Sequence, residues 1–245
     1  KVSFTIKGVL LYSLFFEALG TVILTIAWMQ EYDFAHAVFY AAFYSVSAFN
    51  NGGFSLFPNS LMSFSEHYFI TFTISMLYMI GGIGFIVLMD IKRARRWKKM
   101  SPNSKLILST IAGLNLVAFI VIWALEASNP LTLAGLSLGD QAVNAWFHAT
   151  VPRSSGFNSL DMASMSDAST LVTMVLMFIG GGSLSTAGGI KVGTFIIVIL
   201  SVITFLRRSE ELRVFNHSVS KVTSFKAFAV VSITGILIFL GLFTL

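Results

Sequence analysis

Apolar residues run in long stretches along this chain, and five of these stretches are separated by polar or glycine-rich segments. They cover residues 8–29, 67–89, 105–127, 168–206 and 225–245. An α-helix needs about 20 apolar residues to cross the roughly 30 Å hydrocarbon core of a bilayer. The pattern therefore predicts helices that span a membrane rather than the elements of a soluble domain.

Two shorter apolar segments lie between the long ones, at residues 34–48 and 140–150. Each is too short to span a bilayer, and each is followed by a loop of glycine and small polar residues that a helix does not continue into comfortably. We expect both segments to be half-helices that stop inside the membrane. We expect Asp140 to start the second one, because a carboxylate there favours the free amides and the helix dipole.

The composition agrees with a membrane protein. Hydrophobic residues make up 56% of the chain and charged residues 11%, against about 45–50% and 25% in ordinary soluble domains. The chain has no cysteine, which excludes disulfides, thiolate metal sites and cysteine nucleophiles. The net charge of +5 comes from short basic clusters between apolar stretches, so it does not indicate nucleic-acid binding.

The distribution of charge predicts the orientation of the chain. The basic residues near the ends of apolar stretches are Lys1, Lys7, Lys92, Arg93, Arg95, Arg96, Lys98, Lys99, Arg207, Arg208 and Arg213. The acidic residues Glu31, Asp33, Asp140, Asp161 and Asp167 fall on the opposite side. By the positive-inside rule we expect a multi-pass protein of the plasma membrane whose basic loops are cytoplasmic.

The two loops after the half-helices form an internal repeat. Their sequences are Asn50-Asn51-Gly52-Gly53-Phe54-Ser55 and Arg153-Ser154-Ser155-Gly156-Phe157-Asn158. Aligning them places Gly53 on Gly156 and Phe54 on Phe157, a spacing of 103 residues from position 53 to position 156. A recurrence at a fixed period predicts a repeated structural unit.

The stretch 168–206 is too long for a single span, since 39 residues would reach about 58 Å as one helix. Five glycines lie within positions 180–189 in its middle. We therefore expect two helical halves joined by an irregular loop at membrane depth. Irregular backbone inside a bilayer is tolerated only where it is buried in protein or lines a water-filled cavity.

These loops are typical of a cation path. Glycine allows backbone carbonyls to turn toward a common axis, where they can replace the hydration shell of a monovalent cation. A half-helix also points the negative end of its dipole at the loop that follows it. The alternative is that Gly53 and Gly156 lie in ordinary external turns, and the repetition of the whole pattern favours a pore.

The two loop sequences and the segment 182–191 resemble those of the Trk/Ktr/HKT potassium transporters, most of all the bacterial KtrB type of membrane subunit. Members of this superfamily have four pseudo-repeats, each with two spanning helices around a pore helix and a filter loop. The resemblance covers nearly the whole chain and implies an all-α integral membrane fold around a central pore. It assigns residues 1–104 to the second repeat, 105–220 to the third, and 221–245 to the first helix of the fourth.

The resemblance also implies which residues act. The ion filter would comprise the backbone carbonyls of Asn50, Asn51, Gly52, Gly53, Arg153, Ser154, Ser155 and Gly156. The gate would comprise Gly180, Gly181, Gly182, Ser183, Ser185, Thr186, Gly188, Gly189 and Lys191. The implied function is uptake of potassium, either passive or linked to sodium, by a homodimer in membrane lipid that rests on a cytosolic KtrA-like nucleotide-binding ring.

Several single residues have an expected role. We expect Arg153 to point behind the filter and pair with a carboxylate, and Glu17 to form a structural hydrogen bond to a pore helix rather than to bind ions. Lys191 either faces the gate or extends toward the cytoplasm. The segment 81–84 is expected to allow close helix packing. The histidines are expected to be interfacial or structural: His36, His67, His148 and His217.

Other classes of function fit the sequence less well. An intramembrane enzyme needs a nucleophile with a base, or a metal cluster, and the pattern contains neither. The segment 180–191 is not a phosphate-binding loop, because it lacks the Gly-Lys-Ser/Thr sequence and no strand precedes it. A non-conducting membrane scaffold remains the alternative to a pore.

Overall fold

The computed structural model describes residues 2–209, 211–215 and 217–244, without the side chains of 2–5 and 242. Lys1 and Leu245, which belong to the predicted cytoplasmic side and to the last predicted span, lie outside the described residues. The helices are α1 (Val2–Trp28), α2 (Phe34–Phe49), α3 (Tyr68–Ile83), α4 (Phe85–Ala94), α5 (Pro102–Glu126), α6 (Leu138–Thr150), α7 (Asp167–Phe178), α8 (Val192–Leu206) and α9 (Lys221–Leu242). Short 3₁₀ turns are η1 (Met62–Phe64), η2 (Trp97–Lys99) and η3 (Met162–Ser164).

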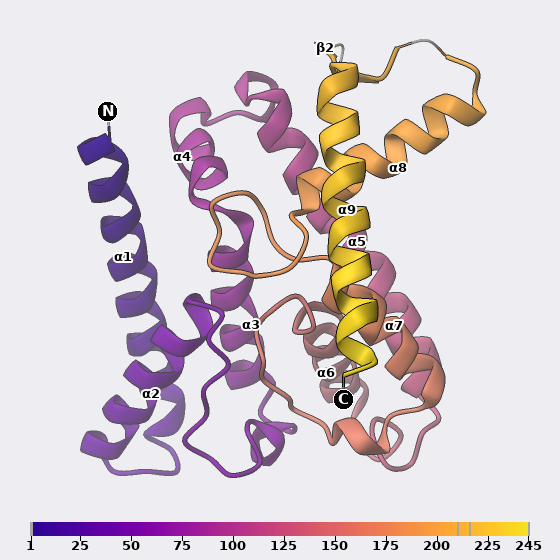
Figure 1. Ribbon diagram of the computed structural model, residues 1–245. Helices are drawn as coiled ribbons and strands as arrows, with labels where there is room; N and C mark the ends of the chain where they lie inside the picture. Colours follow the sequence, from indigo (N-terminus) through magenta and orange to yellow (C-terminus); the bar gives the residue numbers. More distant parts are fainter. Residues whose placement is uncertain (1, 210, 216, 245) are drawn as a thin grey trace.

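Three described helices are long and apolar enough to cross a membrane, in the ranges Ile6–Trp28, Pro102–Glu126 and Lys221–Gly241. They match three of the predicted spans. Figure 1 shows the N-terminal end of α1, helix α4 and strand β2 at one end of the molecule, and α6 and the C-terminal end of α9 toward the other. The basic clusters thus lie together at one end, as the predicted orientation requires.

The span predicted at 67–89 is wrong as a single straight helix. Helix α3 ends at Ile83, and α4 starts at Phe85 with its axis turned by 90°. Gly84 at the bend has a φ of +99°, which favours glycine because a side chain there is strained. The 16 residues of α3 rise about 24 Å, which already covers most of the hydrocarbon core.

Both half-helices are present, as α2 and α6. Helix α2 starts after Asp33, whose carboxylate accepts from the backbone N–H of His36, and a hydrogen bond from the His36 side chain keeps the pKa of the Asp33 carboxyl below its usual value. The predicted start of the second half-helix at Asp140 is wrong. Ser137 is the cap, because its hydroxyl accepts from the Asp140 N–H at 3.3 Å.

The long stretch 168–206 is broken as predicted. Helices α7 and α8 are joined by residues 179–191, which we call the intramembrane loop. Its two ends are held together by backbone hydrogen bonds from Gly180 N to Ile190 O at 2.9 Å and from Val192 N to Gly181 O at 3.0 Å. The loop is therefore closed at its base, and its middle reaches toward α3.

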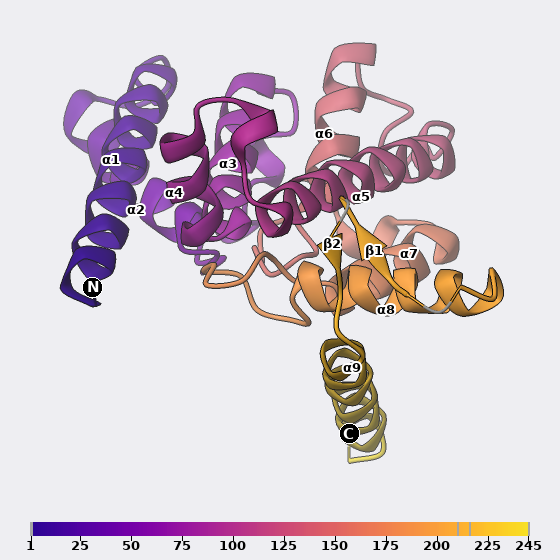
Figure 2. The same ribbon diagram turned by 90° about the horizontal axis from the view of Figure 1, so that it is seen from above.

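The helices form two similar units and one further helix. In the first unit α1, α2 and α3 pack together, in the second α5, α6 and α7 do so, and α3 packs against α6 across the two. Helix α9 packs against α8 and stands apart from the rest in the view from above (Figure 2). A two-residue hairpin, β1 (Arg213–Val214) with β2 (His217–Ser218), lies in the loop between α8 and α9 and was not predicted.

An aromatic core joins the two units. Trp28 and Tyr44 lie fully buried in the first unit, with ring centroids 5.3 Å apart. Phe157 from the second unit packs on Tyr44 at 6.0 Å. Buried Tyr78 of α3 makes a 2.6 Å hydrogen bond with the Thr150 hydroxyl of α6. The two units therefore share one core rather than meeting at a polar surface.

Candidate ion filter and gate

Each half-helix leads into a loop of the same backbone shape. In the first glycine loop (residues 50–55) Asn51 and Gly53 have φ values of +53° and +67°. In the second glycine loop (residues 153–158) Ser154 and Gly156 have φ values of +86° and +79°. The left-handed positions recur at the spacing of the sequence repeat, so the repeat extends from the sequence to the backbone.

The two glycine loops touch through their glycines. A Cβ atom added to Gly53 would lie 2.5 Å from the carbonyl oxygen of Ser155 and 2.7 Å from the Cα atom of Gly156. A Cβ atom on Gly156 would lie 3.0 Å from the Cα atom of Gly53. Both positions combine positive φ with contact between backbones, which only glycine allows.

Asn51 connects four segments through its side chain. Its Nδ2 donates to Thr186 Oγ1 of the intramembrane loop at 2.7 Å and to the Tyr78 carbonyl of α3 at 3.2 Å. Its Oδ1 accepts from the Ser155 hydroxyl of the second glycine loop at 3.2 Å. The Asn51 side chain thus points into the protein, which leaves its backbone as the part that can face an ion.

The intramembrane loop is tied to the back of both glycine loops. Thr186 Oγ1 donates to the Phe49 carbonyl at the end of α2 at 3.0 Å, and Gly188 N donates to the Ser154 hydroxyl at 2.8 Å. The Lys191 amine donates to the Ala187 carbonyl at 2.6 Å, so it stays with the loop instead of extending away from it. Any displacement of this loop must break contacts made by the glycine loops.

The segment 81–84 allows close helix packing as expected, and it also contacts the intramembrane loop. The Gly82 carbonyl accepts from Gly182 N at 2.8 Å, and Phe85 N donates to the Leu184 carbonyl at 3.1 Å. Gly81 thus allows the end of α2 at Phe49 to approach α3, and Gly84 allows the intramembrane loop to do so at Ser183. The contacts with the loop have a simple reason, since a loop with free amides and carbonyls needs backbone partners at this depth.

Arg153 lies behind the second glycine loop as predicted, but its expected carboxylate partner is wrong. Its side chain is buried and donates through Nη2 to the Asn115 side-chain oxygen. Among the described residues, Nε of Arg153 has no hydrogen-bond partner. Beside it lies a cavity of about 20 Å³ lined by residues that include Asn51 and Gly181, a volume that fits one water molecule.

Glu17 has the structural role predicted for it. Its Oε1 accepts from the Asn50 side chain at 2.7 Å, and its backbone carbonyl accepts from the Ser45 hydroxyl of α2 at 2.7 Å. The histidines also lie in structural or interfacial positions. Buried His148 accepts from Leu160 N through Nε2 at 3.2 Å, and His67 lies 3.1 Å from a Glu31 carboxylate oxygen.

The sequence matches the TrkH family, which is described as a cation transport protein, over residues 1–245. This chain belongs to the TrkH family. Its description agrees with the expectation of a transporter rather than an enzyme. The expected resemblance to the Trk/Ktr superfamily is likewise confirmed.

Individual relatives of this TrkH-family chain are named for potassium. It is 41% identical to the Ktr system potassium uptake protein B of Bacillus subtilis, over 98% of this chain and 54% of that protein. It is 37% identical to the protein of the same name in Vibrio alginolyticus, over 98% of this chain and 53% of that protein. It is 30% identical to the potassium/sodium uptake protein NtpJ of Enterococcus hirae, over 92% of this chain and 50% of that protein.

A solved structure has the same fold. The crystal structure of the potassium transporter TrkH from Vibrio parahaemolyticus superposes with a TM-score of 0.69 at 22% identity, covering 91% of this chain and 49% of that one. The likeness supports the all-α membrane fold. The TrkH-family chain spans about half the length of the relatives that it matches.

Sequence reasoning missed the polar residues that join the two units of this TrkH-family chain. Asn115 of α5 donates to the sulfur of Met79 on α3 at 3.9 Å, Tyr78 of α3 bonds Thr150, and Asn144 of α6 donates to the Ser65 carbonyl at 2.7 Å. An isolated asparagine in a spanning helix is a signal for such contacts, because an unpaired amide is costly in hydrocarbon. Its partner, however, becomes known only from the fold.

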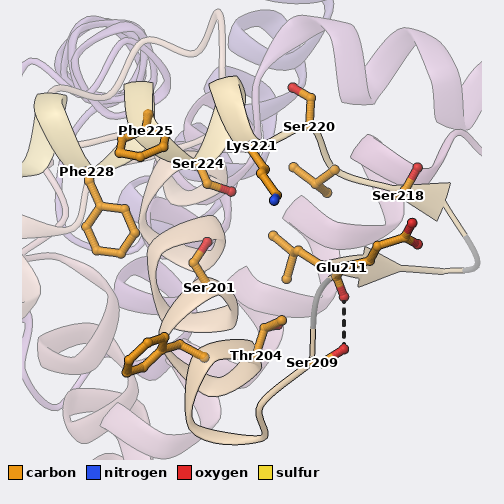
Figure 3. Close-up of a pocket in the computed structure, with 13 residues that line it drawn as sticks. Ser201, Thr204, Ser209, Glu211, Ser218, Ser220, Lys221, Ser224, Phe225 and Phe228 are labelled. Carbon is orange, nitrogen blue, oxygen red and sulfur yellow. Dashed lines mark hydrogen bonds between the residues drawn. The ribbon is translucent and has the colours of Figure 1, made fainter.

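A larger cavity of about 520 Å³ lies between α8, the β1–β2 hairpin and α9 of the TrkH-family chain (Figure 3). Hydroxyl groups of Ser201, Ser218 and Ser224 and the amine of Lys221 line it. None of its lining residues belongs to the glycine loops or the intramembrane loop. The described residues contain no group of three or more histidine, aspartate or glutamate side chains that could hold a metal ion.

Proposed function

We propose that this TrkH-family chain supplies two filter-bearing units of a pore that takes up potassium across the plasma membrane. The observation that carries the proposal is the pair of glycine loops, which follow half-helices, repeat in backbone shape and meet at Gly53 and Gly156. Backbone carbonyls in such loops can replace the hydration shell of potassium.

The proposed filter has eight residues, whose carbonyls bind the ion. They are Asn50, Asn51, Gly52 and Gly53 of the first glycine loop, and Arg153, Ser154, Ser155 and Gly156 of the second. The inward-pointing side chain of Asn51 supports this assignment, because it leaves the backbone free for the ion. A relative named for both potassium and sodium supports sodium as a second ion.

The intramembrane loop is the proposed gate. Its residues Gly180, Gly181, Gly182, Ser183, Ser185, Thr186, Gly188, Gly189 and Lys191 would move to open the path. The hydrogen bonds that join Thr186 to Asn51 and Gly188 to Ser154 support this role. They give the loop one defined position that an opening step can release.

The assembly is proposed from the relatives. Because two relatives belong to a Ktr system, we propose that the full-length protein forms a homodimer in membrane lipid and rests on a cytosolic nucleotide-binding ring of the KtrA type. Residues 1–104, 105–220 and 221–245 would be its second repeat, its third repeat and the first helix of its fourth.

Rubidium uptake into liposomes that contain the full-length protein tests the proposal. We expect uptake that potassium blocks, that sodium blocks less, and that Gly53→Ser or Gly156→Ser degrades. Gly135→Ser is the matched control, because no atom lies within 4 Å of a Cβ added at Gly135. Absent uptake by a folded protein, or uptake indifferent to both loop glycines, would favour the scaffold alternative.

A further inference from the structure

Six cations gather on the segment that follows the bend at Gly84. In the basic segment (residues 92–99) the exposed cationic side chains are Lys92, Arg93, Arg95, Arg96, Lys98 and Lys99. None of them forms an ion pair with another of the described residues. The positive-inside rule explains an excess of cations in a cytoplasmic loop. It does not explain why six of them are exposed in one segment without an ion-pair partner.

The helix before this cluster is perpendicular to α3. Helix α4 is turned by 90° from α3, and α3 already covers about 24 Å of the membrane. The side chains of Ile86 and Ile91 on α4 and of Trp97 after it are exposed. A helix with exposed apolar groups, cations and a nearby tryptophan is typical of one that lies in the interface between water and lipid.

We propose that the basic segment binds anionic phospholipid headgroups of the cytoplasmic leaflet, and that this contact stabilises the intramembrane loop in its present position. Charge complementarity selects the occupant, since clusters of four to eight cations directly after a spanning helix attract anionic lipids. The exposed Trp97 and the 90° turn of α4 from α3 fit a lipid surface better than an acidic protein surface.

Backbone hydrogen bonds connect the start of α4 and the end of α3 to the intramembrane loop. The first amide of α4, on Phe85, donates to the Leu184 carbonyl at 3.1 Å, and the Gly82 carbonyl accepts from Gly182 N at 2.8 Å. Holding α4 against the membrane therefore holds the loop beneath the glycine loops. This regulatory part rests on the proposed function, and it predicts that anionic lipid lowers ion flux.

Lipid binding is tested without any measurement of flux. The full-length protein and its Arg93→Gln/Arg96→Gln/Lys99→Gln variant are purified in mixed micelles of phosphatidylglycerol and phosphatidylcholine, and bound lipids are measured by native mass spectrometry. Each cation near an anionic surface raises binding about fivefold, so we expect the variant to lose phosphatidylglycerol by up to about 100-fold. Lys92, Arg95 and Lys98 remain in it to keep the topology.

The matched control removes three cations from the other cytoplasmic cluster, as Arg207→Gln/Arg208→Gln/Arg213→Gln. We expect it to retain phosphatidylglycerol within a few-fold of wild type. Equal retention by all three proteins would overturn the lipid site. Equal retention combined with loss of binding to an acidic cytosolic partner in the first variant would assign the basic segment to a protein instead.

The effect on the gate is tested by rubidium uptake in vesicles with increasing phosphatidylglycerol. We expect wild-type uptake to fall several-fold and uptake by the Arg93/Arg96/Lys99 variant to change little. Wild-type uptake that does not fall would overturn the regulatory part. If the wild type conducts in no vesicle, the proposed function fails, whereas the lipid measurement still decides the binding site.

Discussion

Replacing Gly53 by alanine should strongly disturb the proposed filter. The new methyl carbon would lie 2.5 Å from the Ser155 carbonyl oxygen, whereas ordinary contacts begin at 3.4 Å. The two glycine loops must therefore separate by about 0.9 Å, the difference between these distances. The positive φ of +67° adds a cost of about 1–2 kcal/mol for a residue with a Cβ atom.

The expected result is a loss of ion discrimination rather than a loss of folding. Strain of about 1–3 kcal/mol at one residue corresponds to a factor of about 5 to 140 in relative binding. We therefore expect Gly53→Ala to lower the preference for potassium over sodium by a factor in that range. The measurement is inhibition of rubidium uptake by each ion in liposomes, with gel filtration to check that the variant is folded.

The neighbouring glycine gives a matched control. A Cβ atom on Gly52 would meet the ring of Phe54 at 3.1 Å, and that side chain is 70% exposed and can turn away. We expect Gly52→Ala to keep the potassium preference within about threefold. If Gly53→Ala discriminated between the ions as well as the wild type, or if the two alanine variants behaved alike, the contact between the glycine loops would not set the ion preference.

Three further predictions concern side chains around the glycine loops. Asn115→Leu removes the side-chain oxygen that accepts from the buried Arg153 guanidinium. It should lower the free energy of unfolding, measured by denaturation in detergent, by about 2 kcal/mol. The control Asn103→Leu, at an exposed position, should change this free energy by less than about 0.5 kcal/mol. Thr186→Val removes the hydroxyl that forms hydrogen bonds with Asn51 and with the end of α2, and it should raise rubidium uptake several-fold. Thr186→Ser keeps the hydroxyl and should have the wild-type rate. Equal rates for the two variants would show that these hydrogen bonds do not hold the loop. Glu17→Gln should conduct as the wild type, because an amide oxygen can still accept from the Asn50 side chain of the first glycine loop, whereas Glu17→Leu should reduce uptake. A loss in both would indicate a role for the Glu17 charge.

The sequence was sufficient for the elements whose pattern depends on neighbouring residues. Length and hydropathy predict α1, α5 and α9, and the glycine cluster predicts the break between α7 and α8. The bend at Gly84 escaped prediction because the apolar pattern continues through it on both sides. Glycine is compatible with a helix as well as with a turn. Here the turn is favoured because the intramembrane loop forms hydrogen bonds with backbone groups on both sides of the bend.

Side-chain partners were harder to predict than positions. The burial of Arg153 follows from its place after a half-helix, but its partner Asn115 lies 38 residues away on another helix. The role of Asn51 as a side-chain hub was not predicted either, because its three partners come from three different segments. Such contacts depend on how the helices pack, which no local pattern records.

The burial of Phe157 on Tyr44 also has a consequence for the synthesis of the protein. The first unit is made before Phe157, yet its aromatic core includes that ring. Phe157 follows the equivalent Phe54 by 103 residues, which take about 5–20 s to add at ordinary translation rates. During this interval the first three helices lie in the bilayer with an incomplete core. Lipid or the insertion machinery must therefore stabilise this intermediate until the second glycine loop has been synthesised.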